Sequence, residues 1–343
     1  MLELKTDYLV VGSGPAGVAA ASALVKSGQL VTLIDSSENL SRPAIVSPTT
    51  TLSQLRKSGA LGAYLLHRDV DHLSQRVPDN GPKYRTPLGF SVINEGQCPD
   101  KSDGIFIPGN NVRGGQSEVW GAAIPRYKDG QLSLMGLDPV EFRHHYSAVE
   151  KMIGVSSQPG QNCIVTPTNF QVPDDILRNI FMKSKLDKSK YESGFCIELV
   201  QNAVAISERN DRAACTLCGR CLWGCPTNSI WSAAFAIDDL DKHPNLKYRP
   251  NHILREIESF DDHAVGKVIH NEEDTVFRAK KVILATGVVQ STRIVARSIG
   301  YTGKVRLHHN PVAAFLALSV AAGGRTNGGE EFGLAQLAWR SSL

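Results

Sequence analysis

The chain has 343 residues, of which 42% are hydrophobic and 21% are charged, and its formal net charge is +3. These values are ordinary for a globular enzyme of about two domains, and the charge is too small to indicate a nucleic-acid or anionic membrane partner. The longest apolar stretch, Val312 to Ala322, is too short to span a bilayer, and the N-terminus lacks a secretory signal pattern. We therefore expect a cytoplasmic protein with no membrane span.

The first predicted element is a β-α-β unit in residues 1–40. The apolar run from Asp7 to Val11 predicts a buried strand. Three glycines follow it in the pattern G-x-G-x-x-G that opens a helix: Gly12, Gly14 and Gly17. They permit a tight turn, close approach of a pyrophosphate and close helix–strand packing, and the helix N-terminus faces the phosphates. Asp35 closes the second predicted strand, at the distance from Gly12 where an acid accepts hydrogen bonds from the adenosine ribose. The unit predicts a dinucleotide site.

The rest of the chain can be divided by its patterns. Residues 41–100 are rich in Ser, Pro and Asn and predict loops and short strands outside the first unit. Residues 155–205 are irregular and are expected to contribute to a substrate domain. The remaining predicted elements are a helix over 138–153 with Pro139 in its first turn, a helix over 228–240, a strand over 244–257, a hairpin over 264–279, and a strand leading into a helix over 280–294.

Four of the seven cysteines have the spacing C-x2-C-x2-C-x3-C-P within residues 215–226: Cys215, Cys218, Cys221 and Cys225. This is the spacing of a bacterial ferredoxin run, in which three thiolates hold one cluster and the fourth normally ligates another. Only one such run exists here, so Cys98, Cys163 or Cys196 would have to supply a further ligand. Three interpretations stay open: a 4Fe–4S cluster, structural cysteines without a cluster, or another metal. Disulfides are disfavoured in a cytosolic chain, and a zinc site usually pairs two short arms across a longer loop.

Two further segments carry a family resemblance. Residues 113–126, RGGQSEVWGAAIPR, contain small residues that let the backbone lie against a flat ligand. Residues 280–294, KKVILATGVVQSTRI, run from an apolar strand through Ala-Thr-Gly into a helical stretch. In this order, and with the G-P-A-G form of the first turn, these segments resemble the glucose–methanol–choline (GMC) oxidoreductases over most of residues 1–310. The resemblance implies an α/β fold with an FAD-binding Rossmann-like domain and a β-rich substrate domain, truncated at the C-terminus.

The resemblance also implies which residues contact FAD. They belong to the glycine turn, the end of the second strand, the small-residue loop, the strand over 244–257 and the Ala-Thr-Gly segment: Gly12, Ser13, Gly14, Pro15, Ala16, Gly17, Asp35, Ser36, Arg113, Gly114, Gly115, Ser117, Trp120, Gly121, Ala122, Leu254, Ala285, Thr286 and Gly287. Relatives that attach the flavin covalently carry a His one residue before the loop Trp. Here Val119 precedes Trp120, so we expect non-covalent FAD.

The catalytic base has no clear candidate in this chain. The family supplies it as a His in a closing segment well after the Ala-Thr-Gly strand, whereas this sequence stops at Leu343, before such a segment. Either a second chain supplies that segment, or His308 or His309 substitutes for it. His144 and His145 lie in a predicted helix and are expected on its surface. The sequence therefore names no catalytic residue.

The resemblance divides the chain into discontinuous domains. We expect residues 1–40, 105–155 and 206–310 to bind FAD, and residues 41–104, 156–205 and 311–343 to form a partial substrate domain. The function expected from the family is hydride transfer to flavin from a CH–OH group of a small sugar or alcohol. The alternative is a truncated, non-catalytic flavoprotein or an FAD and iron–sulfur electron-transfer module.

Overall fold

The computed structural model describes residues 2–37, 50–59, 112–118, 120–155, 195–205, 207–209, 212–221, 225–306, 308, 334 and 337–341. The chain divides into two compact units. Unit 1 comprises Met1–Ser41, Ser91–Glu118 and Ser232–Arg325, and unit 2 comprises Arg42–Phe90, Val119–Trp231 and Thr326–Leu343. The domain boundaries expected from the sequence stay a prediction: they group residues 119–155 and 206–231 with the dinucleotide-binding domain, and unit 2 includes Val119–Trp231. No helix among the described residues is long and apolar enough to cross a membrane.

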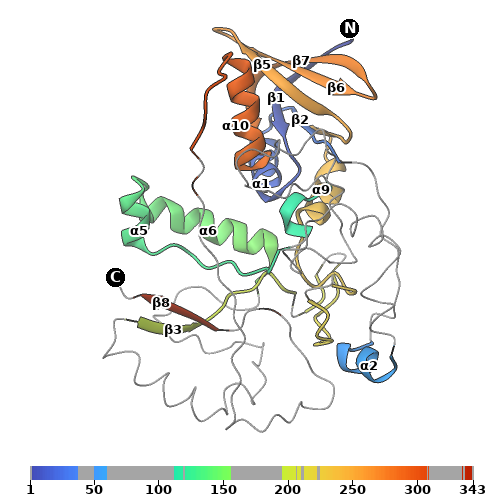
Figure 1. Ribbon diagram of the computed structural model, residues 1–343, viewed down its shortest axis with the longest axis vertical. Helices are drawn as coiled ribbons and strands as arrows, with labels where there is room; N and C mark the ends of the chain where they lie inside the picture. Colours follow the sequence, from blue (N-terminus) through green and yellow to red (C-terminus); the bar gives the residue numbers. More distant parts are fainter. Residues whose placement is uncertain are drawn as a thin grey trace. The chain divides into compact units, whose positions relative to one another are not determined.

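Unit 1 is built on a six-stranded mixed sheet in the order β4-β2-β1-β7-β6-β5 (Figure 1). The strands are β1 (Leu2–Val11), β2 (Val31–Ile34), β4 (Leu246–Arg249), β5 (Ile253–Ser259), β6 (Ala264–His270) and β7 (Glu273–Leu284). β4, β2, β1 and β7 run parallel to one another. β6 pairs antiparallel with β7, and β5 pairs antiparallel with β6. The α/β fold class predicted from the sequence is confirmed.

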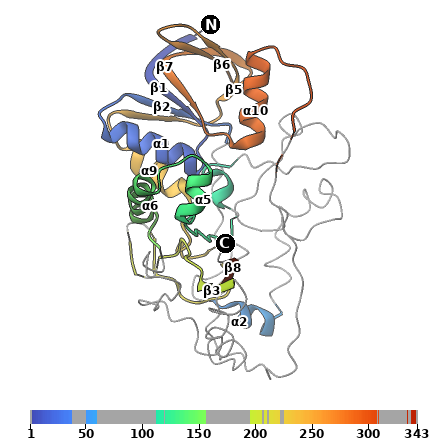
Figure 2. The same cartoon turned by 90° about the vertical axis from the view of Figure 1, so that its left-hand side faces the viewer.

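Three helices belong to this sheet, and each follows from its local sequence. They are α1 (Pro15–Lys26), α9 (Ala233–Asp241) and α10 (Gly287–Ser298). α1 begins at a proline, which suits the first helical position because its missing N–H needs no partner there. α1 and α9 contact each other, and α10 packs on β5 (Figure 2). The predicted strand and helix over 280–294 are therefore confirmed as the end of β7 and α10.

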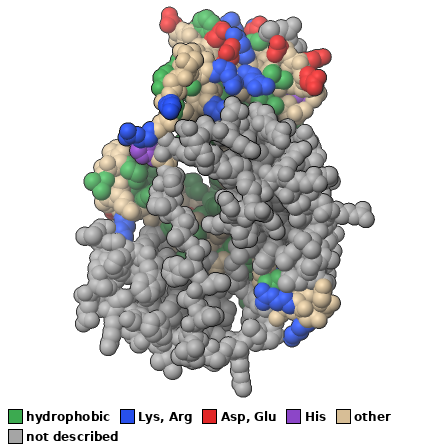
Figure 3. Space-filling model, in the orientation of Figure 1, with side chains coloured by type: hydrophobic (Ala, Val, Ile, Leu, Met, Phe, Trp, Pro, Cys, Tyr) green, Lys and Arg blue, Asp and Glu red, His purple; other side chains and the backbone are tan. Residues whose placement is uncertain are grey.

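The core of unit 1 lies where the parallel and antiparallel parts of the sheet meet. Its buried members are Leu9, Val11, Ile34, Leu254, Val268, Phe277, Ala279 and Ile294. They come from strands far apart in the sequence and from α10, so shared apolar contacts hold these elements together. Lysine and arginine side chains mix with acidic ones on the visible face of the described surface (Figure 3). Cross-strand ion pairs join Arg278 with Glu3 and Lys280 with Asp7.

Turns define two of the predicted strand segments. The hairpin predicted over 264–279 is confirmed as β6 and β7, joined by Asn271 and Glu272, which both have positive φ as a tight hairpin turn requires. The single strand predicted over 244–257 is wrong. It is divided into β4 and β5 by a turn at Asn251, whose φ is 55°. Pro250 before it has no N–H with which to continue the pairing.

Unit 2 contains the described elements α2 (Leu52–Lys57), α5 (Asp129–Leu134), α6 (Pro139–Ile153), β3 (Phe195–Leu199) and β8 (Leu337–Ser341). β3 and β8 form an antiparallel pair. α6 confirms the helix predicted over 138–153, with the Asp138 side chain accepting a hydrogen bond of 2.8 Å from the Val140 N–H. Much of the predicted β-rich substrate domain lies outside the described residues.

Candidate dinucleotide site and cysteine loop

The glycine turn between β1 and α1 is closely packed at two of its three glycines. Gly12 has φ +106°, and a Cβ there would lie 2.5 Å from the carbonyl oxygen of Ala285. At Gly17 a Cβ would overlap the carbonyl oxygen of Gly12. Among the described residues, no atom lies within 4 Å of a Cβ added at Gly14, and no side chain caps the helix that begins at Pro15. The backbone N–H groups of this first turn therefore lie beside an open position, as an anion site requires.

The loop around the short helix η2 (Gly115–Glu118) lies against this turn within unit 1. A Cβ on Gly115 would approach the Cα of Gly14 to 3.2 Å. The Gly114 N–H donates a hydrogen bond of 3.1 Å to the Ser13 hydroxyl. Ser117 in turn donates to the Gly114 carbonyl at 2.6 Å and accepts from the backbone of α9 at 2.9 Å. Four residues predicted from separate motifs are thus brought together: Ser13, Gly114, Gly115 and Ser117.

The Ala-Thr-Gly segment joins the same turn from the other side. The Ala285 N–H donates to the Val11 carbonyl at 2.8 Å, and its own carbonyl lies over Gly12. Gly287 has φ +77° at the start of α10, and Thr286 bonds the Ser291 hydroxyl at 2.9 Å. The segment lies beside the first glycine turn, as the sequence order predicts.

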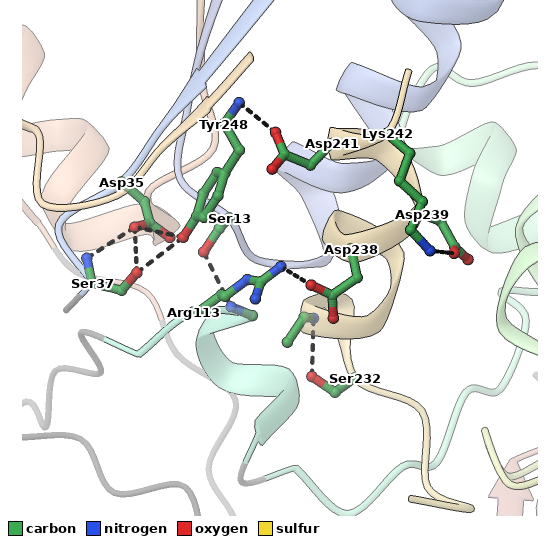
Figure 4. A network of polar contacts seen from close by, with 12 residues as sticks. Ser13, Asp35, Ser37, Arg113, Ser232, Asp238, Asp239, Asp241, Lys242 and Tyr248 are labelled. Atoms are coloured by element: carbon green, nitrogen blue, oxygen red, sulfur yellow. Dashed lines mark hydrogen bonds and ion pairs between the residues drawn. The ribbon is translucent and has the colours of Figure 1, made fainter. Parts of the chain in front are cut away.

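Asp35 lies at the carboxyl end of β2 with its two carboxylate oxygens in different environments (Figure 4). Oδ1 accepts hydrogen bonds from the Ser37 N–H at 2.9 Å, the Ser37 hydroxyl at 2.5 Å and the Tyr248 hydroxyl at 3.2 Å. Oδ2 is buried and has no hydrogen-bond partner among the described residues. A buried acceptor is rarely left without a partner, so Oδ2 is suited to accept from a ligand hydroxyl.

Arg113 lies beside the Tyr248 ring and next to Gly114, whose N–H donates to Ser13 of the glycine turn (Figure 4). Its Nη2 pairs with Asp238 of α9 at 2.5 Å, and its guanidinium lies 5.2 Å from the centre of the Tyr248 ring. Its Nε is buried and has no partner among the described side chains and backbone groups. This donor could serve a phosphate or ribose oxygen.

The remaining predicted contact residues are distributed over both units. Trp120, Gly121 and Ala122 belong to unit 2, where the Trp120 indole N–H donates to the Trp231 carbonyl at 3.0 Å. The Leu254 side chain packs in the core of unit 1, so only its backbone remains for a ligand. Pro15 and Ala16 begin α1, and Ser36 is half-buried beside Asp35. Val119 and His309 lie outside the described residues.

The sequence reasoning did not identify Ser37, Tyr248 or Asp238, which complete this polar network. Tyr248 is 213 residues from Asp35 in the sequence. A signal was available for it: a residue near the end of the strand beside β2 must lie close to the acid that follows β2. Using that signal requires the sheet order, which one sequence does not provide.

The cysteine segment forms a compact loop in unit 2. The Cys215 N–H donates to the Ala205 carbonyl at 2.9 Å, and the Cys218 carbonyl accepts from Leu52 at 2.7 Å. The Cys225 thiol lies 3.4 Å from the Thr227 hydroxyl. Burial, with smaller contributions from Cys225 and Cys218, raises the pKa of Cys215 to about 11. Among the described residues no three Cys, His, Asp or Glu side chains are grouped as metal ligands, so the predicted set Cys215, Cys218, Cys221 and Cys225 is not assembled here.

Buried arginines hold this loop together. Arg212 donates to the carbonyls of Ile153, Asn228 and Ser229, and Arg220 donates to the Thr50 carbonyl at 3.1 Å. Burial lowers the pKa of Arg212 to about 10. The positive charge of Arg209 also lowers this pKa, whereas Cys225 raises it. Because Asn228 to Trp231 belong to this loop, the helix predicted over 228–240 begins only at Ala233, capped by Ser232.

No protein-family model and no curated protein matches the sequence. The chain is similar to the solved structure of pyridoxine 4-oxidase from Mesorbium loti, with 14% identity and a TM-score of 0.46, over 85% of this chain and 52% of that one. It is also similar to a flavoprotein/dehydrogenase from Cytophaga hutchinsonii (12% identity, TM-score 0.29, 87% and 42%). A third is p-nitrophenol 4-monooxygenase PnpA from Pseudomonas putida DLL-E4 (15% identity, TM-score 0.28, 85% and 42%). The chain spans about half the length of the first of these proteins and less than half of the others.

Proposed function

We propose that this chain is an FAD-dependent oxidoreductase whose unit 1 binds the ADP half of the flavin. The observation that carries the proposal is the buried Oδ2 of Asp35, which has no partner among the described residues. It lies at the end of β2, where a dinucleotide's ribose binds after a glycine turn of this type. The open position at Gly14 supports a pyrophosphate at the N-terminus of α1.

The described residues fit FAD at this half of the ligand. Oδ2 of Asp35 would accept from a ribose hydroxyl, the first-turn N–H groups of α1 would hold the diphosphate, and Nε of Arg113 would donate to an oxygen between them. Gly115 would line the same position because it lies against Gly14. We propose non-covalent binding because Val119 stands where covalent relatives carry a His.

The proposed reaction is oxidation of a CH–OH group of a small alcohol or sugar. When bound, FAD accepts the hydride, and a protein base takes the hydroxyl proton. The described residues offer no obvious base: His308 is exposed, and His144 and His145 lie on exposed positions of α6. We propose that a second chain or a segment outside the described residues supplies it, and that the protein works in the cytoplasm.

A second candidate function is a non-catalytic flavoprotein or an electron-transfer module. The ferredoxin spacing of residues 215–226 favours this candidate, because a 4Fe–4S cluster would carry flavin electrons singly to an acceptor. Cys215, Cys218 and Cys225 form no disulfide with one another, so their thiols remain available for ligation.

One experiment tests both candidates. The full chain is purified without oxygen, its absorption spectrum is recorded, and iron and acid-labile sulfide are assayed on the same sample. Flavin bands without iron support the oxidoreductase and make the cysteines structural. Flavin bands with stoichiometric iron and sulfide support the electron-transfer module. A colourless protein that does not take up added FAD contradicts both.

A further inference from the structure

The Asp35 carboxylate is hydrogen-bonded on one oxygen only. Three donors converge on Oδ1, two from Ser37 and one from the Tyr248 hydroxyl, whereas Oδ2 has none among the described residues (Figure 4). Ser37 follows Asp35 by two residues, so its two bonds form a local turn. The third donor comes from another strand and has no local reason to be there.

Tyr248 is fixed in this position by the sheet. β4 runs parallel to β2 with Tyr248 opposite Leu33 and Arg249 opposite Ile34, which places the Tyr248 ring one residue from the end where Asp35 follows. Its hydroxyl also lies 3.1 Å from the Ser37 hydroxyl, and Arg113 lies over its ring. Burial, followed by the negative charge of Asp35, raises the pKa of Tyr248 above its ordinary value. The hydroxyl therefore keeps its proton at neutral pH and remains a donor.

We propose that Tyr248 is a positioning residue of the ribose subsite, which holds the Asp35 carboxylate by Oδ1 and leaves Oδ2 for a ribose hydroxyl. The inference rests on the proposed function, because it assigns a specificity determinant to the same ADP-binding site. A carboxylate bonded on one side has one orientation, so it discriminates between a ribose with free hydroxyls and one without. A ligand lacking these hydroxyls would leave Oδ2 buried and unpaired, which costs affinity.

The test compares ADP with 2′,3′-dideoxy-ADP, because the two differ only in the hydroxyls that Asp35 would recognise. Dissociation constants are measured by calorimetry on the flavin-free full chain of the wild type and of Tyr248→Phe. Tyr301→Phe is the matched control, since its hydroxyl bonds the Lys304 carbonyl on an exposed segment. We expect wild type and control to prefer ADP. We expect Tyr248→Phe to lower this preference roughly three- to tenfold, the value of one ordinary hydrogen bond, because Tyr248 acts on the ribose only through Asp35.

The outcomes separate the possible roles of Tyr248. A purely structural role would weaken both ligands equally and leave their ratio unchanged, which overturns the inference, as does a wild type that binds both ligands equally. A wild type that binds neither ADP nor FAD overturns the proposed function itself. Ser37→Ala removes another donor from Oδ1 and should lower the same ratio. It keeps the inference testable if Tyr248→Phe is unstable.

Discussion

The three glycines of the first turn are required for different reasons, and their substitutions should therefore behave differently. Gly17→Ala would place a methyl group on the Gly12 carbonyl, so we expect unstable protein. Gly14→Ala meets no described atom and should fold, but its methyl group would occupy the position proposed for the pyrophosphate, so we expect weaker FAD binding. Gly14→Glu should fold too but release FAD, because its carboxylate would face the pyrophosphate. Circular dichroism and flavin content measured on the same samples check this; a yellow, FAD-loaded Gly14→Glu protein contradicts the site.

Asp35 should contribute to cofactor affinity through its ribose contact. We expect Asp35→Ala to raise the dissociation constant of FAD about tenfold or more, the value of a hydrogen bond to a charged acceptor. Fluorescence titration of the flavin-free protein measures it. Asp261→Ala, which removes an exposed carboxylate, is the matched control and should leave the constant unchanged. Equal constants for both variants would exclude Asp35 from the site.

At this scale the sequence reveals the residues of local motifs and misses those that depend on sheet order. Gly12, Gly14, Gly17 and Asp35 follow from spacing alone, because a single β-α-β unit places them. Tyr248 joins them only because β4 pairs with β2, a contact between strands that lie far apart in the sequence.

Helices and strands were predictable where strong local signals mark their ends. α6 begins after an Asp cap with proline at its first position, and β6 and β7 meet at a turn with two residues of positive φ. The start of α9 was not predictable in this way. The residues before it, Asn228 to Trp231, have weak helix propensity, and tertiary hydrogen bonds hold them in the cysteine loop, such as that from the Trp231 N–H to the Ala203 carbonyl.

The cysteine loop should depend on Arg212 for its stability. Arg212→Met keeps much of the side-chain volume but removes the donor that the carbonyls of Ile153, Asn228 and Ser229 share. Ser229 still accepts from the Ala205 N–H, so the other two carbonyls lose their donor, and we expect a loss of about 2–6 kcal/mol in unfolding free energy at roughly 1–3 kcal/mol each. Urea unfolding measures it. Arg143→Met, at a largely exposed ion pair with Asp129, should cost less than about 1 kcal/mol. Equal losses would contradict the role of Arg212.

The turn between β4 and β5 should make unit 1 sensitive to acid. His252 is buried and stacks on His270 with ring centres 4.1 Å apart. Burial lowers the pKa of His252. The positive charges of His270 and Arg249 lower it further, whereas the Pro250 carbonyl and Asp35 raise it. Above pH ~6.5 the folded and unfolded states both hold neutral His252. Below that pH the unfolded chain binds a proton that the folded state does not, so stability falls until the lowered pKa is reached.

Urea unfolding of wild type and His252→Gln at pH 7.5 and 5.5 measures this effect. The wild type should lose more stability between the two pH values than the variant, which cannot titrate at this position. The backbone N–H of His252 also donates to the backbone carbonyl of Asp35 at 2.7 Å, so flavin release should accompany the loss of stability. The same pH dependence in both proteins would show that His252 does not carry it.

At the scale of the whole molecule, the attachment of the cofactor can be tested on the intact chain. The proposed non-covalent binding of FAD predicts that precipitation with trichloroacetic acid releases all flavin into the supernatant. Absorbance of the supernatant and of the redissolved pellet measures the two fractions. Flavin that stays in the pellet after washing would show a covalent bond to the protein.

The division into two units was only partly accessible from the sequence. The first β-α-β unit and the return of residues 232–306 to the same sheet follow motif order. Residues 119–155 begin within the small-residue loop over 113–126, so the sequence assigns them to the dinucleotide-binding domain. Their hydrogen bonds include that from the Ile124 N–H to the Gln201 carbonyl within unit 2. Sequence proximity to a motif does not determine which core a segment joins.

The sheet order also has a consequence during synthesis. β1 lies between β2 and β7, and β7 begins at Glu273, whereas β1 ends at Val11, so the ribosome makes these neighbours far apart in time. Because translation proceeds at only a few to tens of residues per second, one edge of the apolar strand β1 stays without its partner for on the order of tens of seconds. An unpaired strand edge is a template for pairing with other chains. The yield of native protein in a cell should therefore depend on chaperones that shield the emerging N-terminus, and slower translation should increase that dependence.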